Sequence, residues 1–587
     1  MLRAKTERMD AILVHTMHER EQCRRVALGL DPPTLLLKGG RVYSPFTGEF
    51  FRADVAICED LIAGVGDYPG GAVRTVDASG ACLVPGFTDA HVHPETSLLS
   101  PPRFAEALAV HGTTTTVSEP HELVNVLGRA GMDFYLQARS GLPLDLRLMV
   151  PTTVPASAFE RASGFLTKED VSQLLLNDGV SGLGEAMDYM GLIDGRSRPA
   201  LLDPGRRHVI DGHAPEVAGP QLAAYMLAGP VSDHETSDPG VLLERRRLGM
   251  WILIREGSAA RDLVRALPFL VEYGTERTAL CTDDRNAAAL AEHHHIDGVV
   301  GALARAGVPL NDSLRAATIN PATLYRLYDR GSIAPGQRAD VLVVDDPSFP
   351  HPRMVIQEGR VVAENGALTI PLPPTPALVS APLRLAISRS EELAPQAPDG
   401  PHQARAIHVT PRTIVSEERI VEVRARGGRV MAEIDKDVAL LALLESRGDS
   451  LQVGRGLVSG LGLRRGAIAT TIAHDAHHLL VTGIDADDML LAARAVAATG
   501  GGLAVVDAGR VQTLPLPLAG LMTDLPVTEV AGHLRSLEAA VAELGVDFEE
   551  PFMVLSFITL SVIPRLRLTL DGLLDVQAQR LVPVIVS

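Results

Sequence analysis

Apolar and polar residues alternate in short runs over residues 34–84, and turn-forming residues separate the runs. A period of two is typical of half-buried strands, so this stretch predicts a small β-unit. Residues 331–370 repeat the pattern of short apolar runs and turns. We therefore expect residues 34–84 and 331–370 to form one composite β-domain.

Between residues 85 and 330 the pattern changes. Short β-rich runs, such as TTTTV, LRLMV and MWILIREGS, alternate with alanine- and leucine-rich segments of helical period. Repeated strand–helix alternation over this length is typical of a parallel barrel. We expect an α/β protein in which residues 85–330 form a (β/α)8 TIM-like barrel.

The remaining parts of the chain predict two further units. The proline-rich segment TIPLPPTPALVSAPL, at residues 369–383, predicts a linker, and residues 380–587 predict an additional C-terminal α/β domain. Residues 1–33 mix acidic and basic residues and predict an N-terminal helical extension. Several domains are expected, because 587 residues exceed what one hydrophobic core usually supports.

Composition and charge exclude several classes of function. A net charge of −18 argues against nucleic acid as a partner, and no apolar run is long enough to predict a membrane span. The four cysteines lack CxxC spacing, which favours a reducing, cytoplasmic location. The chain has neither a Walker loop nor a GxSxG elbow. These features argue against nucleic-acid binding, a membrane span, binding of nucleotide triphosphates and a serine hydrolase.

Potential metal ligands stand at the ends of the predicted barrel strands. His91 and His93 are two residues apart in FTDAHVHPE, and residues at this spacing in a strand point to the same face. Taken singly, the other histidines of this kind are more often core or surface residues than ligands. The joint pattern changes that expectation, because strand ends converge at the C-terminal mouth of a parallel barrel. The candidate ligands are His91, His93, Glu185, His213, His234 and Asp283.

Four imidazoles and two carboxylates exceed the needs of one tetrahedral ion. A carboxylate can bridge two ions, so the set predicts two divalent metal ions per chain that share Glu185. Histidine and carboxylate ligands accept Mn, Fe(II) or Zn. We expect Mn or Fe(II), with Zn as the alternative.

Several longer motifs resemble the amidohydrolase superfamily and, within it, the adenine deaminase family. The resemblance runs from about residue 34 to the end of the chain. The histidine pair is common to many hydrolases, whereas SEPHE, AHDAH and PFMVLSF are far more particular. The motifs are PGFTDAHVHPETS, HGTTTTVSEPHELVNVLG, GLGEAMDYMGLIDG, CTDDR, INPATLYRL, GSIAPGQRADVLVVDD, GLGLRRGAIATTIAHDAHHLLVTG, LPLPLAGLMTD and PFMVLSFITLSVIP.

The resemblance implies which strand carries each ligand. His91 and His93 would lie on the first barrel strand, Glu185 on the fourth, His213 on the fifth, His234 on the sixth and Asp283 on the eighth. Many binuclear relatives bridge their metals with a carboxylated lysine. Here the only lysine of the predicted barrel is Lys168, in a helix-start pattern, so Glu185 is left as the bridge.

The implied reaction is hydrolysis of adenine to hypoxanthine and ammonia, in which water activated by the two ions attacks C6. Asp283 would accept the proton of this water. Glu235 is the first candidate to protonate the ring and the leaving amine, and His121 is the second. Asp284 would hydrogen-bond the purine. A homodimer is expected.

Two other functions stay open. A cyclic amide or imide hydrolase of the same superfamily would use the same ligands, although the absence of a strand lysine and the presence of the C-terminal domain speak against it. A non-catalytic binding protein would have no reason to retain all six ligands.

Some residues depart from the family pattern or lie outside the predicted site. The family form of AHDAH continues with Asn where this chain has His478, and a His is expected where Asn286 stands. We interpret His474, Asp475 and His477 as a structural hydrogen-bond network, with pocket lining or an additional ion as alternatives. The run His293–His295 predicts a solvated helix face.

Overall fold

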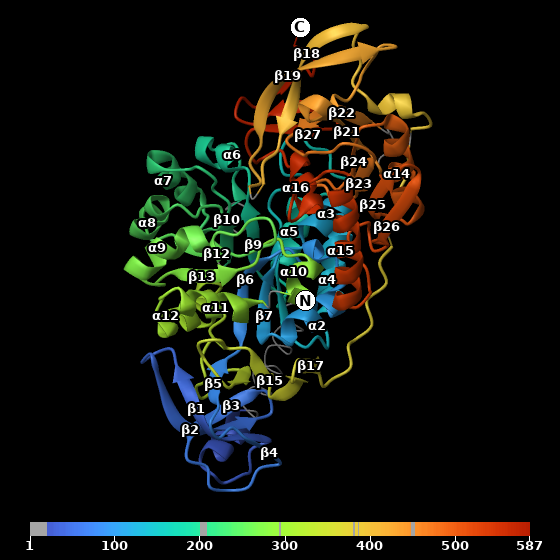
Figure 1. The fold of residues 1–587 in the computed structure, drawn as a ribbon. Coiled ribbons are helices and arrows are strands. Elements are labelled where there is room, and N and C mark those ends of the chain that lie inside the picture. The colour runs from blue at the N-terminus through green and yellow to red at the C-terminus, as the bar shows by residue number, and fades with distance from the viewer. Residues whose placement is uncertain are drawn as a thin grey trace.

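The computed structural model describes residues 20–199, 208–292, 295–379, 382–385, 387–411, 413–447 and 452–586. Of the predicted N-terminal extension, residues 1–19 lie outside this part of the chain, and residues 20–27 are helical. The fold is α/β, with the N-terminal sheet at one end, the C-terminal sheet at the other and parallel strands between them (Figure 1).

The first sheet is built from two segments that are far apart in sequence. Its strand order is β17-β16-β15-β14-β5-β1-β2-β3, with β4 paired to β1. The segments join where β14 pairs antiparallel with β5, opposing Val343 to Leu83. The chain thus returns to this sheet after the central part. The strands are β1 (Leu35–Ser44), β2 (Glu49–Cys58), β3 (Leu61–Gly66), β4 (Arg74–Asp77), β5 (Cys82–Pro85), β14 (Val341–Val344), β15 (Pro352–Gln357), β16 (Arg360–Glu364) and β17 (Ala367–Leu368).

The central part contains two parallel sheets. One has the order β10-β9-β8-β7-β6 and the other β11-β12-β13. Every residue of β7 is buried, as expected for a parallel strand covered on both faces. The strands are β6 (Phe87–Val92), β7 (Thr113–Ser118), β8 (Asp145–Val150), β9 (Val180–Ala186), β10 (Val209–Gly212), β11 (Ser232–Asp233), β12 (Trp251–Arg255) and β13 (Thr278–Cys281).

Backbone hydrogen bonds connect these two sheets at both of their edges. Val231, just before β11, donates its N–H to Ile210 of β10 over 3.1 Å. Asp283, just after β13, donates its N–H to the carbonyl of His91 on β6 over 2.9 Å.

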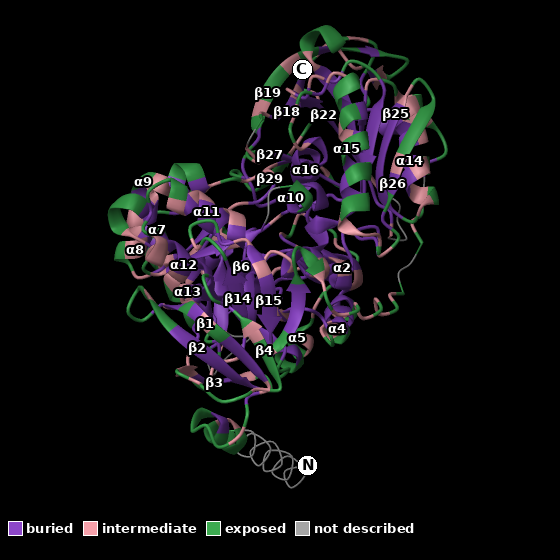
Figure 2. Cartoon of the chain, turned by 60° about the horizontal axis from the view of Figure 1, so that its bottom comes forward, coloured by how far each residue is buried: buried purple, intermediate pink, exposed green. Residues whose placement is uncertain are grey.

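Helices follow the strands along the chain, and their outer faces are exposed in Figure 2. They include α2 (Pro101–Ala109), α3 (His121–Leu127), α4 (Arg129–Ala138), α5 (Lys168–Leu174), α6 (Tyr189–Asp194), α7 (Gly219–Ala228), α8 (Pro239–Arg247), α9 (Leu263–Tyr273), α10 (Ala287–Glu292), α11 (Ile296–Arg305), α12 (Leu310–Ala317) and α13 (Ile319–Leu324).

The C-terminal part contains a third large sheet, of order β20-β19-β18-β22-β21-β24-β23-β25-β26. The proline-rich segment that leads to it has no helix or strand over residues 371–379. None of the helices described is both long and apolar enough to cross a membrane. The elements are β18 (Gly400–His408), β19 (Glu417–Arg426), β20 (Arg429–Val430), β21 (Val438–Leu444), β22 (Val453–Ser459), β23 (Ala467–Thr470), β24 (Leu479–Gly483), α14 (Ala486–Ala498), β25 (Gly502–Asp507), β26 (Arg510–Pro515), α15 (Val527–Glu543), α16 (Pro551–Ser556), β27 (Leu566–Thr569), β28 (Gly572–Asp575) and β29 (Arg580–Val582).

Helix α15 packs against α10 and so joins the C-terminal part to the segment that follows β13 (Figure 1). Glu550 lies at this contact and accepts a hydrogen bond from the Nδ2 of Asn286 over 2.5 Å. Burial, together with the nearby Glu550 carboxylate, raises the pKa of Glu538 to about 8. Glu538 is therefore protonated in the folded protein at pH values where it is ionised in the unfolded chain.

A pH-dependent contribution to stability follows from this shift. The folded state holds the extra proton between pH 4.5, the ordinary pKa of a glutamate side chain, and about pH 8, so stability falls as pH rises through this window. Glu538→Gln should remove that loss and raise the free energy of unfolding at pH 9 by on the order of 1 kcal/mol, because solvent screens part of the effect at this half-buried site. Thermal unfolding at pH 5 and pH 9 measures it. Glu543→Gln, at the exposed end of the same helix, is the control; an equal effect of Glu538→Gln at both pH values would contradict the prediction.

Candidate metal centre and active site

The six candidate ligands meet at the carboxyl ends of the central strands. Along the chain, β6, β9, β10, β11 and β13 are the first, fourth, fifth, sixth and eighth of the parallel strands. The histidines and Glu185 lie on a strand or directly follow one, and the carboxylate after β13 stands two residues beyond it. All six are buried: His91, His93, Glu185, His213, His234 and Asp283.

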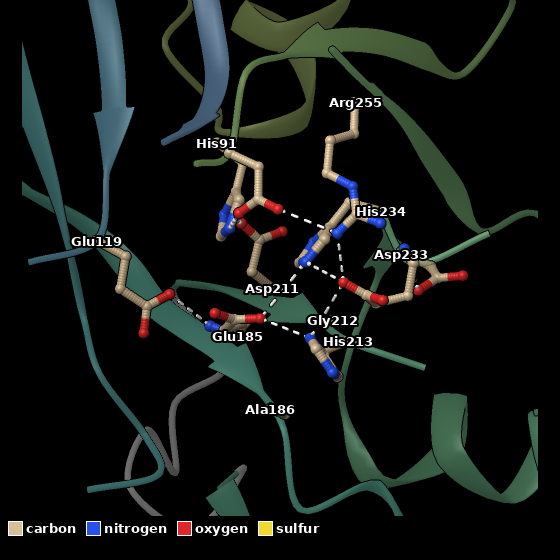
Figure 3. A network of polar contacts seen from close by, with 12 residues as sticks. His91, Glu119, Glu185, Ala186, Asp211, Gly212, His213, Asp233, His234 and Arg255 are labelled. Carbon is tan, nitrogen blue, oxygen red and sulfur yellow. Dashed lines mark hydrogen bonds and ion pairs between the residues drawn. The ribbon is translucent and has the colours of Figure 1, made fainter. Parts of the chain in front are cut away.

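Glu185 lies between two sets of histidines, as Figure 3 shows for His213 and His234. Its Oε2 is 2.8 Å from the Nδ1 of His213 and 3.4 Å from the Nε2 of His234. Its other oxygen, Oε1, is 3.2 Å from the Nε2 of His93. One carboxylate therefore offers each of its oxygens to a different side of the cluster, as a bridging ligand must.

Asp283 completes the side of the cluster that contains His91 and His93. Its Oδ1 is 3.3 Å from the Nε2 of His93 and 3.5 Å from the Nε2 of His91. Two backbone hydrogen bonds fix this arrangement, because Asp283 donates to the carbonyl of His91 and accepts from the N–H of His93. The connection between β13 and β6 thus sets the position of the carboxylate.

The donor set fits divalent metal ions. Separations of 3.2 to 3.5 Å are those expected between ligand atoms that surround one ion at about 2.1 Å. Neither ring nitrogen of the fully buried His91 makes a hydrogen bond within the described parts of the chain, although Asp211 lies 3.4 Å from its Nδ1 and Asp283 3.5 Å from its Nε2. A buried polar atom usually has a partner. Metal coordination would provide one. Lys168 is exposed at the start of α5 and so cannot bridge two ions in the buried cluster, which leaves Glu185 as the bridging ligand.

Glu235 and Arg255 adjoin the cluster. Arg255 ends β12 and places its Nη1 2.5 Å from Oε1 of Glu235 and 3.0 Å from Oδ2 of Asp283. Burial alone would raise the pKa of Glu235, but the Arg255 charge and the nearby His213 hold it well below its usual range. Glu235 is therefore ionised, and its oxygens face the same space as the ligands.

Asp284 behaves differently from its neighbour. Burial and the adjacent Asp283 carboxylate raise the pKa of Asp284 to about 7. Both residues line one pocket together with Glu235. The pocket therefore contains one carboxyl group that keeps its proton near neutral pH and others that do not.

The C-terminal part of the chain forms the opposite wall of this pocket. Phe557, Leu560 and Ile563 supply apolar side chains, and His474 and Asp475 supply polar ones. His474 stacks on Phe557 with 4.8 Å between ring centroids. The site is thus enclosed by two parts of the chain, and the AHDAH motif contributes two residues to its lining.

Two residues of this region differ from the predicted site: Arg255 was left out of it, and His295 was placed wrongly. Arg255 stands at the end of its strand, so the sequence allowed it to face the mouth, but it was left out of the predicted site. His295, expected on a solvated face, is instead buried: its Nδ1 is 2.7 Å from Thr113 and its Nε2 3.1 Å from Asp89. That prediction was wrong because His295 precedes α11 and packs against β7; His293 and His294 lie outside the described residues.

His121 lines the pocket but has partners on both sides of its ring. Its Nε2 is 2.8 Å from Asp475 and its Nδ1 is 3.4 Å from Glu119. Asn286 is turned away toward Glu550, and His478 contacts the carbonyl of Arg161 over 2.7 Å. The two positions that depart from the family pattern therefore make contacts away from the ligand cluster.

Comparisons with known proteins agree on the family. The amidohydrolase family matches residues 82–192 and 241–370, and the adenine deaminase C-terminal domain matches residues 413–580. Adenine deaminase 2 from Carboxydothermus hydrogenoformans is 42% identical over 565 residues, which cover 95% of this chain and 98% of the relative. An adenine deaminase from Methanoregula boonei is 38% identical over 95% of this chain and 97% of its own length.

Among solved structures, dihydropyrimidinase from Brevibacillus agri aligns with 57% of this chain and 96% of its own, at 14% identity and a TM-score of 0.46. The sequence relatives, by contrast, match over nearly their full length. With the match to the C-terminal domain, this coverage establishes that the chain belongs to the adenine deaminase family of amidohydrolases.

Proposed function

We propose that the protein hydrolyses adenine to hypoxanthine and ammonia. The observation that carries this proposal is the buried cluster around Glu185, which combines the donors of a two-metal centre with a pocket walled by apolar side chains. Curated relatives that match nearly the whole chain are named adenine deaminases, which supports the same substrate. Phe557 and its apolar neighbours offer a surface suited to a planar base.

Two divalent ions, Mn or Fe(II) before Zn, would be held by two overlapping sets of ligands. His91, His93 and Asp283 form one set, and His213 with His234 the other, with Glu185 shared between them. Ions bound there would lower the pKa of a water molecule and so supply the nucleophile. The ligands stand where the mouth of a closed (β/α)8 barrel would place them, and the backbone bonds at both edges of the parallel sheets support that closure.

The protein's own groups would move the protons. Asp283 accepts the proton of the attacking water on its carboxylate. Glu235 is ionised, so it takes up a proton that originates from the attacking water before it delivers one to the ring nitrogen, and the second proton of this water leaves with the amine. Asp284, which keeps its proton near neutral pH, is suited to hydrogen-bond a ring nitrogen of the purine. His121, the second candidate for proton transfer, has carboxylate partners at both nitrogens, and we now assign it to positioning.

A substrate panel tests the function directly. Protein loaded with Mn(II) is expected to convert adenine to equal amounts of hypoxanthine and ammonia and to leave dihydrouracil and hydantoin unchanged. Hydrolysis of either cyclic amide without adenine turnover would overturn the proposal in favour of a cyclic amide hydrolase. Binding of adenine without any product would indicate a non-catalytic binding protein.

The domain boundaries, location and oligomeric state expected from the sequence are part of the proposal. We propose a composite β-domain of residues 34–84 and 331–370, a barrel of residues 85–330 and a C-terminal domain of residues 380–587. A cytoplasmic location and a homodimer, with adenine and water as the small-molecule partners, belong to the same proposal.

A further inference from the structure

We propose that His474 and Asp475 of the C-terminal domain are positioning residues for the metal ligands of the barrel. The inference rests on the proposed function, because it assumes that the cluster around Glu185 holds metal ions. It goes further because it assigns a role to these two residues of the AHDAH motif. Each is connected to a metal ligand through a different carboxylate. These carboxylates are Glu119 and Glu122, which flank Pro120 and His121 after β7.

The first connection begins at Asp475. Its Oδ2 is 2.8 Å from the Nε2 of His121, and the Nδ1 of His121 is 3.4 Å from Oε1 of Glu119. The other oxygen of Glu119 accepts the backbone N–H of Glu185 over 2.7 Å (Figure 3). Every residue of this connection is buried, so bulk water does not compete for its hydrogen bonds. Asp475 therefore orients His121, which in turn orients the carboxylate that holds the backbone of the bridging residue.

The second connection begins at His474. Its Nδ1 is 3.4 Å from Oε1 of Glu122, and Oε2 of Glu122 is 3.5 Å from the Nδ1 of His93. The same Nδ1 of His93 lies 3.1 Å from the carbonyl oxygen of Glu119. Both acceptors suit a protonated Nδ1, which leaves the Nε2 of His93 unprotonated and directed at Glu185 and Asp283. A carboxylate behind a metal-binding histidine fixes its tautomer and ring orientation in this way.

The two connections act on different ligands but start from adjacent residues. A shift of the 474–475 segment would therefore disturb His93 and Glu185 together. Loss of such outer partners typically lowers metal affinity or activity by about 10- to 100-fold. A purely structural role for the motif would instead lower stability alone, and this difference makes the two interpretations separable.

The experiment uses the full chain and two pairs of variants. Asp475→Leu removes the acceptor for His121, and Asp475→Asn keeps its shape and one oxygen. His474→Phe keeps the ring that stacks on Phe557 but removes the N–H that faces Glu122, and His474→Asn restores a donor near that position. His478→Asn is the matched control, because His478 is buried in the same segment but contacts only the carbonyl of Arg161 among the partners described for it.

For each protein, Mn(II) affinity is measured by competition with a chelator, the melting temperature is measured on the metal-free form, and kcat and KM are measured at saturating Mn(II). We expect Asp475→Leu and His474→Phe to lose about 10- to 100-fold in Mn(II) affinity and to lower kcat more than they raise KM. Both Asn variants at these positions should recover part of the loss, and His478→Asn should behave as the unsubstituted protein.

The inference is overturned if the folded variants bind Mn(II) and turn over adenine within about twofold of the unsubstituted protein, or if His478→Asn causes the same loss. If the Leu or Phe variant does not fold, the Asn variants decide by the same criteria. Failure of the proposed function is a different result, because the unsubstituted protein would then fail to bind Mn(II) or to release ammonia from adenine.

Discussion

Glu185→Gln should lower kcat/KM for adenine by at least about 100-fold and should leave fewer than two Mn(II) ions bound per chain. Both carboxylate oxygens of Glu185 face histidine nitrogens, on opposite sides of the cluster. An amide keeps the shape but loses the negative charge and one of the two acceptor oxygens, so it cannot bridge two cations. Loss of an outer-shell partner alone typically costs about 10- to 100-fold, and a shared ligand should cost at least as much as the upper value.

Metal analysis, steady-state kinetics and the melting temperature of the metal-free protein together measure this effect. Glu169→Gln, the same substitution at an exposed position of α5, is the control for the change in composition. A Glu185→Gln protein that still binds two ions and retains its turnover would exclude a bridging role for this residue.

Glu235→Gln should lower kcat by about 10²- to 10⁴-fold and leave two ions bound. The Arg255 guanidinium lies beside Glu235 and keeps it ionised before the reaction, so its carboxylate has to take up a proton that the attacking water releases before it can act as an acid. Glutamine fits the same space and can still accept a hydrogen bond from Arg255, but it cannot carry the proton. The loss should therefore appear mainly in kcat and only weakly in KM.

Metal content separates two explanations for a loss of activity in this variant. Glu235, His213 and His234 lie close enough together to hold one ion. Loss of an ion from the variant would therefore identify Glu235 as a ligand and contradict its role in proton transfer. Unchanged turnover would also exclude the role. Glu272→Gln, on the exposed side of α9, provides the control.

The strand pattern predicted that the candidate ligands lie together at one side of the parallel strands. His91, Glu185 and the later candidate ligands stand together because the alternation of strands and helices makes all parallel strands end at one side of the sheet. The return of the chain to the first sheet could also be predicted, because residues 331–370 repeat the pattern of short apolar runs and turns found in residues 34–84. Both features depend on local patterns that recur at regular intervals.

The contacts of the C-terminal segment could not be derived in the same way. Asp475 and His121 are 354 residues apart in sequence, and no local period relates them. Glu119 and Glu122 belong to the SEPHE motif, but nothing in the sequence states that His474 will face Glu122. Their role depends on how two separate sheets pack together, and the pattern of residues along the chain does not show this packing.

Reconstitution of the metal-free protein tests the central claim most directly. Mn(II) is added stepwise, and bound metal, hypoxanthine and ammonia are measured at each step. Turnover of adenine should rise until two ions are bound per chain and then remain constant, with hypoxanthine and ammonia formed in equal amounts. Full activity at one ion per chain, or two bound ions without release of ammonia from adenine, would contradict the account.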